Sequence, residues 1–171
     1  MLDERAYVVS ITGNNAIVIG SKYLTPLEVI LRKGSEETNI VELLYIGKEK
    51  REKVYSIRKK SSADELVKVD ETDFIGVLET IIRQNAEFSV NFLNNSKAAS
   101  LKRHQLQLIH NVGEKIFQRL IEEREKEPFN SLEDAEERAE SEIVKLLAKR
   151  IHLELTAPDK YYLFVKNPKQ K

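Results

Sequence analysis

The sequence predicts an α+β multidomain protein in which a small N-terminal β-barrel precedes an all-α domain. Residues 1–60 alternate short runs of β-branched and aromatic residues with turn-forming clusters, a pattern typical of all-β domains. After residue 60, apolar residues recur three and four positions apart, which is the spacing of amphipathic helices. The 171 residues are enough for one medium domain or two small ones, each with its own core.

The barrel prediction rests on five β-rich runs separated by clusters such as Gly13-Asn14-Asn15 and Lys33-Gly34-Ser35. Short strands at this spacing favour a small barrel, in which pairing closes the edges of the sheet. We therefore place the barrel over residues 1–60. Its predicted strands are Tyr7–Ile11, Ala16–Ile19, Leu27–Leu31, Ile40–Ile46 and Val54–Ile57.

Connecting helices are predicted over residues 61–96. Ser62 and Glu65 have the spacing of a capping box, which marks a helix start. A long apolar stripe follows and ends at Asn94-Asn95-Ser96, and we expect it to pack between the two halves rather than to contact a ligand. The stripe consists of Phe74, Val77, Leu78, Ile81, Ile82, Phe88 and Phe92.

The stretch Ile109–Lys115 carries most of the functional argument. Apolar residues from Leu101 to Ile109 predict a short helix before it, and a second helix is predicted from Gly113 to about Lys126. The first amides of a helix have no partner within it, and the helix dipole adds partial positive charge, so phosphate is favoured there. Gly113 permits close backbone approach, and Lys115 adds a full charge. An ordinary helix-turn-helix corner explains the same glycine.

A second pair of helices is predicted farther along the chain. Ser131 followed by Asp134 indicates a helix start, and the last helix is predicted from an apolar stripe at fourfold spacing. The turn between them, Glu140-Ser141-Glu142, has no glycine and carries two acids, so we expect it to be a structural partner of the first turn. The stripe of the last helix consists of Ile143, Leu147, Ile151 and Leu155.

These patterns place an all-α domain at residues 97–157 and a C-terminal strand with a basic tail at residues 158–171. The predicted strand is Lys160–Val165, which we expect to return to the barrel. The absence of Cys and of any long apolar run leads us to expect a cytoplasmic protein. We expect no cofactor and no metal site, because His104, His110 and His152 lack ligand spacing.

Charge is segregated along the chain although the formal net charge is zero. Residues 48–60 hold seven Lys or Arg against Glu49 and Glu52, whereas residues 122–142 hold ten acids against three cations. Either these segments are solvated surfaces, or one basic face binds a polyanion. Tyr45 and Tyr55 lie within or beside the basic segment and could stack on bases or pack in the core.

The stretch Ile109–Lys115 resembles the turn of helix-hairpin-helix motifs, which bind nucleic acids without reading sequence. The chain also contains Tyr45-Ile46-Gly47-Lys48 with Arg51, residues 103–108, Glu122-Glu123-Arg124, residues 128–134, residues 148–151 and residues 160–164. Through these segments, most of the chain resembles DUF655, an archaeal family described as predicted RNA-binding proteins. That likeness implies an atypical oligonucleotide-binding-type (OB-like) barrel joined to tandem helix-hairpin-helix motifs. The family usually has Pro-Gly where this chain has His110-Asn111.

We therefore predict a non-enzymatic RNA-binding protein that contacts the phosphate backbone, with ribosomal RNA or another component of the translation machinery as the target that the resemblance implies. The alternatives are DNA, a nucleic-acid-processing enzyme, and an adaptor for protein partners. No catalytic constellation supports the enzyme. The predicted contacts are Asn111, Val112, Gly113, Glu114 and Lys115 in the hairpin, Lys102, Arg103 and His104 before it, and Lys48, Lys50, Arg51, Lys53 and Arg58 in the barrel.

Overall fold

A computed structural model describes residues 3–34, 37–157 and 160–166. The chain divides into two compact units: unit 1 comprises residues 1–81 and 152–171, and unit 2 comprises residues 82–151. The divisions fall inside two helices, whereas the sequence-predicted boundaries lie at residues 60, 96 and 157. Within the described part of the chain, no helix is both long and apolar enough to cross a membrane.

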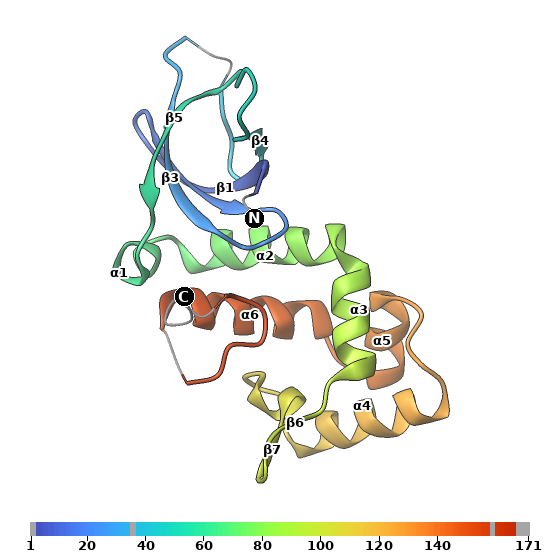
Figure 1. Ribbon diagram of the computed structural model, residues 1–171. Coiled ribbons are helices and arrows are strands. Elements are labelled where there is room, and N and C mark those ends of the chain that lie inside the picture. The colour runs from blue at the N-terminus through green and yellow to red at the C-terminus, as the bar shows by residue number, and fades with distance from the viewer. Residues whose placement is uncertain (1–2, 35–36, 158–159, 167–171) are drawn as a thin grey trace. The chain divides into compact units, whose positions relative to one another are not determined.

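Unit 1 contains a curled antiparallel sheet with the strand order β4-β1-β2-β3-β5 (Figure 1). The prediction of five strands is confirmed, but the sheet is a half-barrel rather than a closed barrel, because β4 and β5 remain its two outer strands. Residue Val41 has a φ of 71°, which interrupts the predicted strand over residues 40–46 and leaves β4 only three residues long. The strands are β1 (Arg5–Thr12), β2 (Asn15–Gly20), β3 (Pro26–Leu31), β4 (Leu43–Tyr45) and β5 (Val54–Lys60).

Apolar side chains are buried on both faces of this sheet. Successive residues of a strand point to opposite faces. Ala6 and Val8 of β1 belong to the core of the half-barrel, while the intervening Tyr7 is buried on the other face. In the same unit, the first three turns of α2 (Glu71–Gln84) run beneath the sheet (Figure 1). The remaining members of the core cluster are Ala16, Val18, Val29, Leu31, Leu44, Ile46 and Val54.

The predicted capping box is confirmed at α1 (Ala63–Leu66), where Ser62 and Glu65 exchange hydrogen bonds. The long apolar stripe begins one element later, in α2. It does not continue through Phe92 as one helix, because the backbone at Asn85 (φ −118°, ψ 40°) is not helical and separates α2 from α3 (Ala86–Asn95). As a result Phe88 is 59% exposed.

The predicted strand at Lys160–Val165 is wrong: the described residues 160–166 form no strand. The amides of Leu163, Phe164 and Val165 instead donate to the carboxylate of Glu154, at 2.7, 3.1 and 2.9 Å. Glu154 is only 3% exposed and lies on α6 (Ile143–Thr156). Three amides converging on one carboxylate cannot also form a sheet ladder. The rest of the predicted basic tail, residues 158–159 and 167–171, lies outside the described residues.

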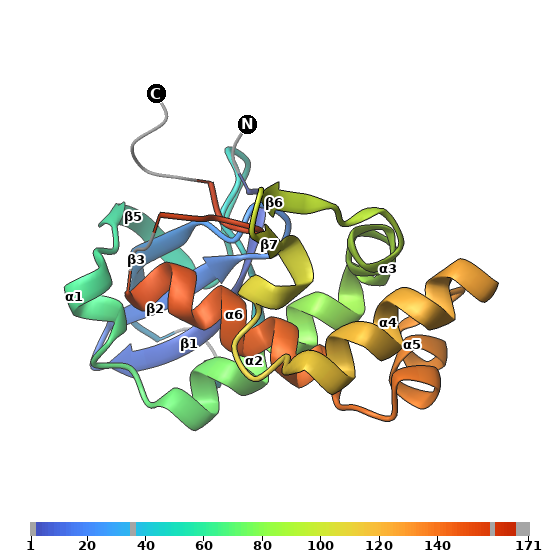
Figure 2. The same cartoon turned by 90° about the horizontal axis from the view of Figure 1, so that it is seen from below.

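Unit 2 is helical apart from one small β-hairpin (Figure 2). The predicted helix from Leu101 to Ile109 is wrong: the hairpin occupies its first half, and a single 3-10 turn occupies the second. The backbone N–H of Gln105 donates to the Lys97 carbonyl at 2.9 Å, which commits this segment to the hairpin. The elements are β6 (Ala98–Ser100), β7 (Arg103–His104), η1 (Gln105–Leu108), α4 (Glu114–Lys126) and α5 (Leu132–Ala139), followed by α6.

Much of the acidic segment at residues 122–142 is neutralised inside unit 2. Arg138 forms ion pairs with Glu123 and Asp134, at 3.3 and 3.1 Å, and donates to the Glu127 carbonyl at 2.7 Å. Its guanidinium also lies 4.6 Å above the centroid of the Phe129 ring. These contacts tie α4 to α5 across the loop that joins them, so the acids serve the fold as well as facing solvent.

Candidate nucleic-acid interface

The predicted hairpin is a four-residue turn between η1 and α4. The Val112 N–H donates to the Ile109 carbonyl at 3.1 Å and closes the turn. Asn111, its third residue, has a φ of 65°, while Gly113 has a φ of −74°. Positive φ at the third residue is the signature of a type II turn, and Asn tolerates it better than other non-glycine residues. The conformational demand therefore falls on Asn111, as the departure from Pro-Gly in the sequence suggested.

Four consecutive amides at this helix start have no hydrogen-bond partner among the described residues. The first hydrogen bond within α4 runs from the Phe117 N–H to the Gly113 carbonyl at 3.0 Å. Among the described residues, the N–H groups of residues 113–116 donate to no acceptor. The Val112 amide, which the sequence prediction included, is already used inside the turn, and the Ile116 amide takes its place in the set. With Gly113 as the N-cap, the amides without a partner inside the helix are those of the N-cap and the next three residues, which are residues 113–116.

The space beside Gly113 is open. A methyl group built on Gly113 would meet no atom within 4 Å. The side chains of Lys115 and Glu114 are exposed, and the Glu114 carboxylate accepts a hydrogen bond from Gln118 at 2.7 Å. This helix start thus offers donors, partial positive charge and one cation to an anion, against one carboxylate.

His104 supports the turn from inside rather than facing solvent. Its Nδ1 accepts a hydrogen bond from the Leu106 N–H at 3.1 Å, which caps η1, and its ring lies 5.3 Å from the Phe117 ring. Burial, and secondarily the charge of Arg124, lower the pKa of His104, opposed by a hydrogen bond with Ser96. The neutral imidazole explains the residue's position without a ligand, although the sequence placed it among the contacts.

Arg150 also supports the turn, and sequence reasoning missed it. The side chain is 3% exposed, and Nη1 donates to the Leu108 carbonyl at 2.9 Å, directly before the turn. Its position three residues after Leu147 and one before Ile151, on the edge of an apolar stripe, was the available signal. A buried guanidinium on a core-facing edge requires acceptors nearby.

The other predicted cations of unit 2 lie on the β6–β7 hairpin. The side chains of Lys102 and Arg103 are exposed, and neither has an ion-pair or hydrogen-bond partner among the described residues. The two predicted groups, hairpin and preceding cations, therefore belong to the same compact unit.

The basic segment of unit 1 is less available than its composition suggests. Lys53 pairs with Glu42 at 2.6 Å, Arg58 pairs with Glu28 at 2.8 Å, and Arg51 donates to the Gly47 carbonyl at 2.7 Å. Lys48 and Lys50 are exposed and have no such partner within the described ranges. Two of the five predicted barrel cations are thus free for an external anion.

The two tyrosines of this segment differ in exposure. Tyr55 is 65% exposed, with the Arg32 guanidinium 5.8 Å from its ring centroid. Tyr45 is half-buried, and its hydroxyl accepts a hydrogen bond from the Glu49 amide at 3.3 Å. Only the Tyr55 ring therefore offers a broad face to solvent for stacking.

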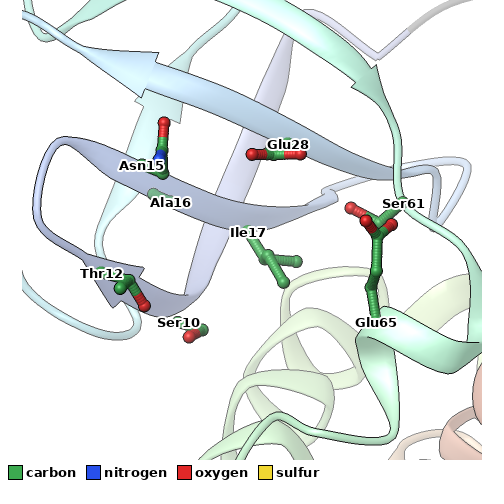
Figure 3. A pocket seen from close by; sticks show the side chains of 8 residues that line it. All are labelled: Ser10, Thr12, Asn15, Ala16, Ile17, Glu28, Ser61 and Glu65. Carbon is green, nitrogen blue, oxygen red and sulfur yellow. The ribbon is translucent and has the colours of Figure 1, made fainter.

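A shallow hollow of about 200 Å³ opens elsewhere in unit 1, where β1–β3 meet the start of α1 (Figure 3). Its lining includes the carboxylate of Glu28, which pairs with Arg58, and that of Glu65, which pairs with Lys59. The hydrogen bond from Lys59, with those from Ser62, lowers the pKa of Glu65 to about 2. Carboxylates have the same sign of charge as phosphate, so this hollow is not part of the candidate interface.

The second turn, between α5 and α6, has a positive φ at the same position as the first, but its helix start is already occupied by a carboxylate of the protein. Glu140 has a φ of 49° and precedes the first residue of α6 by three positions, as Asn111 precedes the first residue of α4. Here the Glu136 carboxylate accepts from the Val144 N–H at 3.0 Å, and Glu140 is held by Arg119 in a two-point ion pair. A carboxylate of the protein thus occupies the place where an anion could bind.

The lowered pKa values of two histidines lead us to expect that the stability of the protein depends on pH. Burial lowers the pKa of His152, which packs edge-on against Phe74, and this outweighs the opposing charge of Glu71. His104 shifts in the same direction. A His whose pKa is lowered on folding stabilises the protein fully above the unfolded value, near 6.5, and loses that contribution as pH falls below it. The unfolding temperature should therefore fall between pH 7.5 and pH 5.5, as measured by circular dichroism.

The double variant His152→Phe with His104→Asn tests this origin. Phenylalanine preserves apolar packing at position 152, and the Asn side-chain oxygen can accept the capping hydrogen bond at position 104. The variant should lose most of the pH dependence in this window, because carboxylates titrate below it. The control is His110→Gln, at an exposed histidine, which should behave as wild type. If the unfolding temperature of the double variant fell with pH as much as that of wild type, the assignment to these two histidines would be wrong.

No three His, Asp or Glu side chains gather as a metal site would require within residues 3–34, 37–157 and 160–166.

The family described as "Protein of unknown function (DUF655)" matches residues 10–166. MJ0038 of Methanocaldococcus jannaschii is 31% identical over 169 residues, covering 97% of this chain and 78% of that protein. The crystal structure of Af1531 from Archaeoglobus fulgidus matches with a TM-score of 0.86 at 32% identity, covering 96% of this chain and 100% of that chain. The chain therefore belongs to the DUF655 family.

Proposed function

We propose that this protein binds RNA, without catalysis, by holding backbone phosphate at the start of α4. The observation that carries the proposal is the row of unpartnered amides at residues 113–116, in open space beside Lys115. Amides at a helix start, together with the helix dipole, favour an anion. Contacts of this kind position a nucleic acid and read no bases, so we expect little sequence preference.

The two turns of unit 2 support the interpretation as tandem helix-hairpin-helix motifs. In each turn a residue with positive φ precedes the next helix by three positions. The first motif is unusual, because a 3-10 turn takes the place of its first helix. The second is filled by the Glu136 carboxylate. One motif binds phosphate in this proposal, and the other completes the fold.

The choice of RNA over DNA rests on the resemblance to a family described as predicted RNA-binding, with ribosomal RNA or another structured RNA of translation as the target class. In unit 1, the exposed cations Lys48 and Lys50, with the exposed Tyr55 ring, provide a second contact on the atypical OB-like half-barrel. The paired cations Lys53 and Arg58 would have to exchange partners to take part.

The test is Gly113→Asp combined with Lys115→Glu. Asp is a good N-cap residue, so the fold survives while its carboxylate occupies the amides, as Glu136 does in the second turn. Binding to ribosomal RNA fragments, transfer RNA, single-stranded DNA and duplex DNA is measured at two salt concentrations. We expect RNA affinity to fall by about tenfold to 100-fold, and the salt slope to fall by about one or more, as when phosphate contacts are lost.

A control with the same charge change is Val67→Asp combined with Lys68→Glu, two exposed residues just after α1. It should retain wild-type affinity if the effect is local. Equal loss in both variants would mean that general charge, rather than the helix start, drives binding. Tighter binding to duplex DNA than to any RNA would mean that the ligand is DNA. Turnover of a labelled nucleic acid would favour an enzyme, provided that substitution of a single carboxylate abolishes it.

A further inference from the structure

The tip of the β6–β7 hairpin presents an apolar side chain to solvent. Leu101 has a relative exposure of 106%, the highest of the exposed large apolar residues in the described chain. Folding does not bury the Leu101 side chain. Single exposed apolar residues are common on protein surfaces, so the residues around Leu101 decide what the tip can bind. Its neighbours in the turn, Ser100 and Lys102, are polar and exposed.

This tip is built on a fixed base. The Lys97 N–H donates to the Gln105 side chain at 2.9 Å, and the Gln105 N–H returns a hydrogen bond to the Lys97 carbonyl at 2.9 Å. At the tip the Lys102 N–H donates to the Ser100 hydroxyl at 3.3 Å. A two-stranded hairpin alone is marginally stable, so these bonds to the start of η1 are what hold the tip in place.

The surroundings of Leu101 carry positive charge without compensation. No Asp or Glu occurs between Phe88 and Gly113, in a chain that has 28 acids. Three cations flank the tip, and within the described residues none of their side chains has a carboxylate partner. The tip therefore suits a ligand that combines negative charge with apolar surface. The three cations are Lys97, Lys102 and Arg103.

We propose that Leu101 inserts between stacked bases of the bound RNA while Lys97, Lys102 and Arg103 neutralise the flanking phosphates. The inference rests on the proposed function and adds to it a further contact, one made with unstacked bases rather than with the phosphate backbone. Aliphatic side chains act as wedges of this kind when they are flanked by cations, and the insertion is easiest where stacking is already weak. The preferred RNA is therefore a helix with a bulge.

A nucleic acid fits this tip better than a membrane does. One leucine is a small apolar area, and stable attachment to a bilayer needs a larger apolar face or a second anchoring signal. The same compact unit also holds the open amides of residues 113–116, which are donors suited to phosphate oxygens. Each nucleotide of an RNA strand carries both a base and a phosphate, so one RNA can contact the leucine with a base and the cations with its phosphates.

The experiment uses an RNA hairpin with a single-nucleotide bulge and 2-aminopurine beside the bulge. Wild-type protein should raise the 2-aminopurine fluorescence, because insertion unstacks the base. Leu101→Ala should abolish that rise and weaken binding by about tenfold, with an unchanged salt slope. Lys102→Gln with Arg103→Gln should lower the salt slope by roughly 1.8, at about 0.9 for each lost phosphate contact. Val67→Ala, at another exposed apolar residue, should change nothing.

The outcomes separate this inference from the proposed function. RNA binding that depends on Gly113 and Lys115 but is unaffected by Leu101→Ala, in affinity and in fluorescence, would overturn the wedge alone. Failure of wild-type protein to bind any RNA would overturn both. Wild-type protein could instead cosediment with phosphatidylserine vesicles, lose this binding in Leu101→Ala, and leave the 2-aminopurine fluorescence unchanged. That result would show that the tip binds lipid, and it would also overturn the wedge.

Discussion

Replacing Arg150 with Met should lower the free energy of unfolding by about 2–4 kcal/mol and weaken RNA binding. The Leu108 carbonyl would lose its donor inside the protein, and a buried acceptor without a partner costs about 1–3 kcal/mol. Arg150 has further contacts that the substitution also removes. Because Leu108 directly precedes the Ile109–Val112 turn, its displacement would misplace the amides of residues 113–116.

Urea unfolding and RNA titration of the same preparations measure the two effects. Lys149→Met is the matched control, since it makes the same kind of change one residue away at a partly exposed position. Arg150→Lys keeps the charge with a single donor site and should fall between wild type and Arg150→Met. If Arg150→Met were as stable as Lys149→Met, the guanidinium would not support the turn, and its assignment as a positioning residue would be wrong.

Gly20→Ala should destabilise unit 1 by about 3 kcal/mol. A Cβ at position 20 would lie 1.9 Å from the Oδ2 atom and 2.2 Å from the Cγ atom of Asp3. That carboxylate is buried, and its Oδ1 accepts hydrogen bonds from the amides of Lys22 and Tyr23 at 2.8 and 3.0 Å. It can leave only by breaking both bonds, and overpacking alone typically costs about 1–3 kcal/mol.

A double-mutant cycle isolates the contact. In an Asp3→Ala background the obstructing carboxylate is absent, so Gly20→Ala should cost at least about 1 kcal/mol less than in wild type. Gly76→Ala gives the contrast: nothing lies within 4 Å of its Cβ position in α2, and the change should stabilise by up to about 1 kcal/mol. Equal costs in the two backgrounds would show that the carboxylate is not the obstacle. Thermal unfolding measures the four proteins of the cycle and the Gly76→Ala variant.

The elements that sequence predicts well are those with a local cause. Ser131 accepts the Asp134 amide as its spacing indicates, and the apolar stripe of α6 is buried throughout. The start of α4 at Gly113 has the same local origin, since a turn and a change of periodicity are visible in the residues themselves. The five strands could be predicted one by one because alternation and turn residues are also local signals, whereas the predicted closure of the sheet into a barrel was wrong.

The parts that sequence does not predict depend on contacts between distant residues. The helix expected near Leu101 becomes a hairpin through hydrogen bonds between Lys97 and Gln105, which no periodicity reveals. The strand expected near Leu163 is absent because Glu154 takes its amides. Likewise, composition shows the cations of residues 48–60 but not the acids that pair with them, so the sequence overstates the free charge of this surface.

The contact between Glu154 and residues 163–165 has a consequence for the order in which the protein forms during synthesis. Unit 2 is one continuous segment, whereas unit 1 is completed by residues that follow it in the chain. Once residue 151 has been synthesised, all of unit 2 is present, while unit 1 still lacks Glu154 and the three amides that donate to the buried Glu154 carboxylate. The unit that begins first is therefore the one that finishes last.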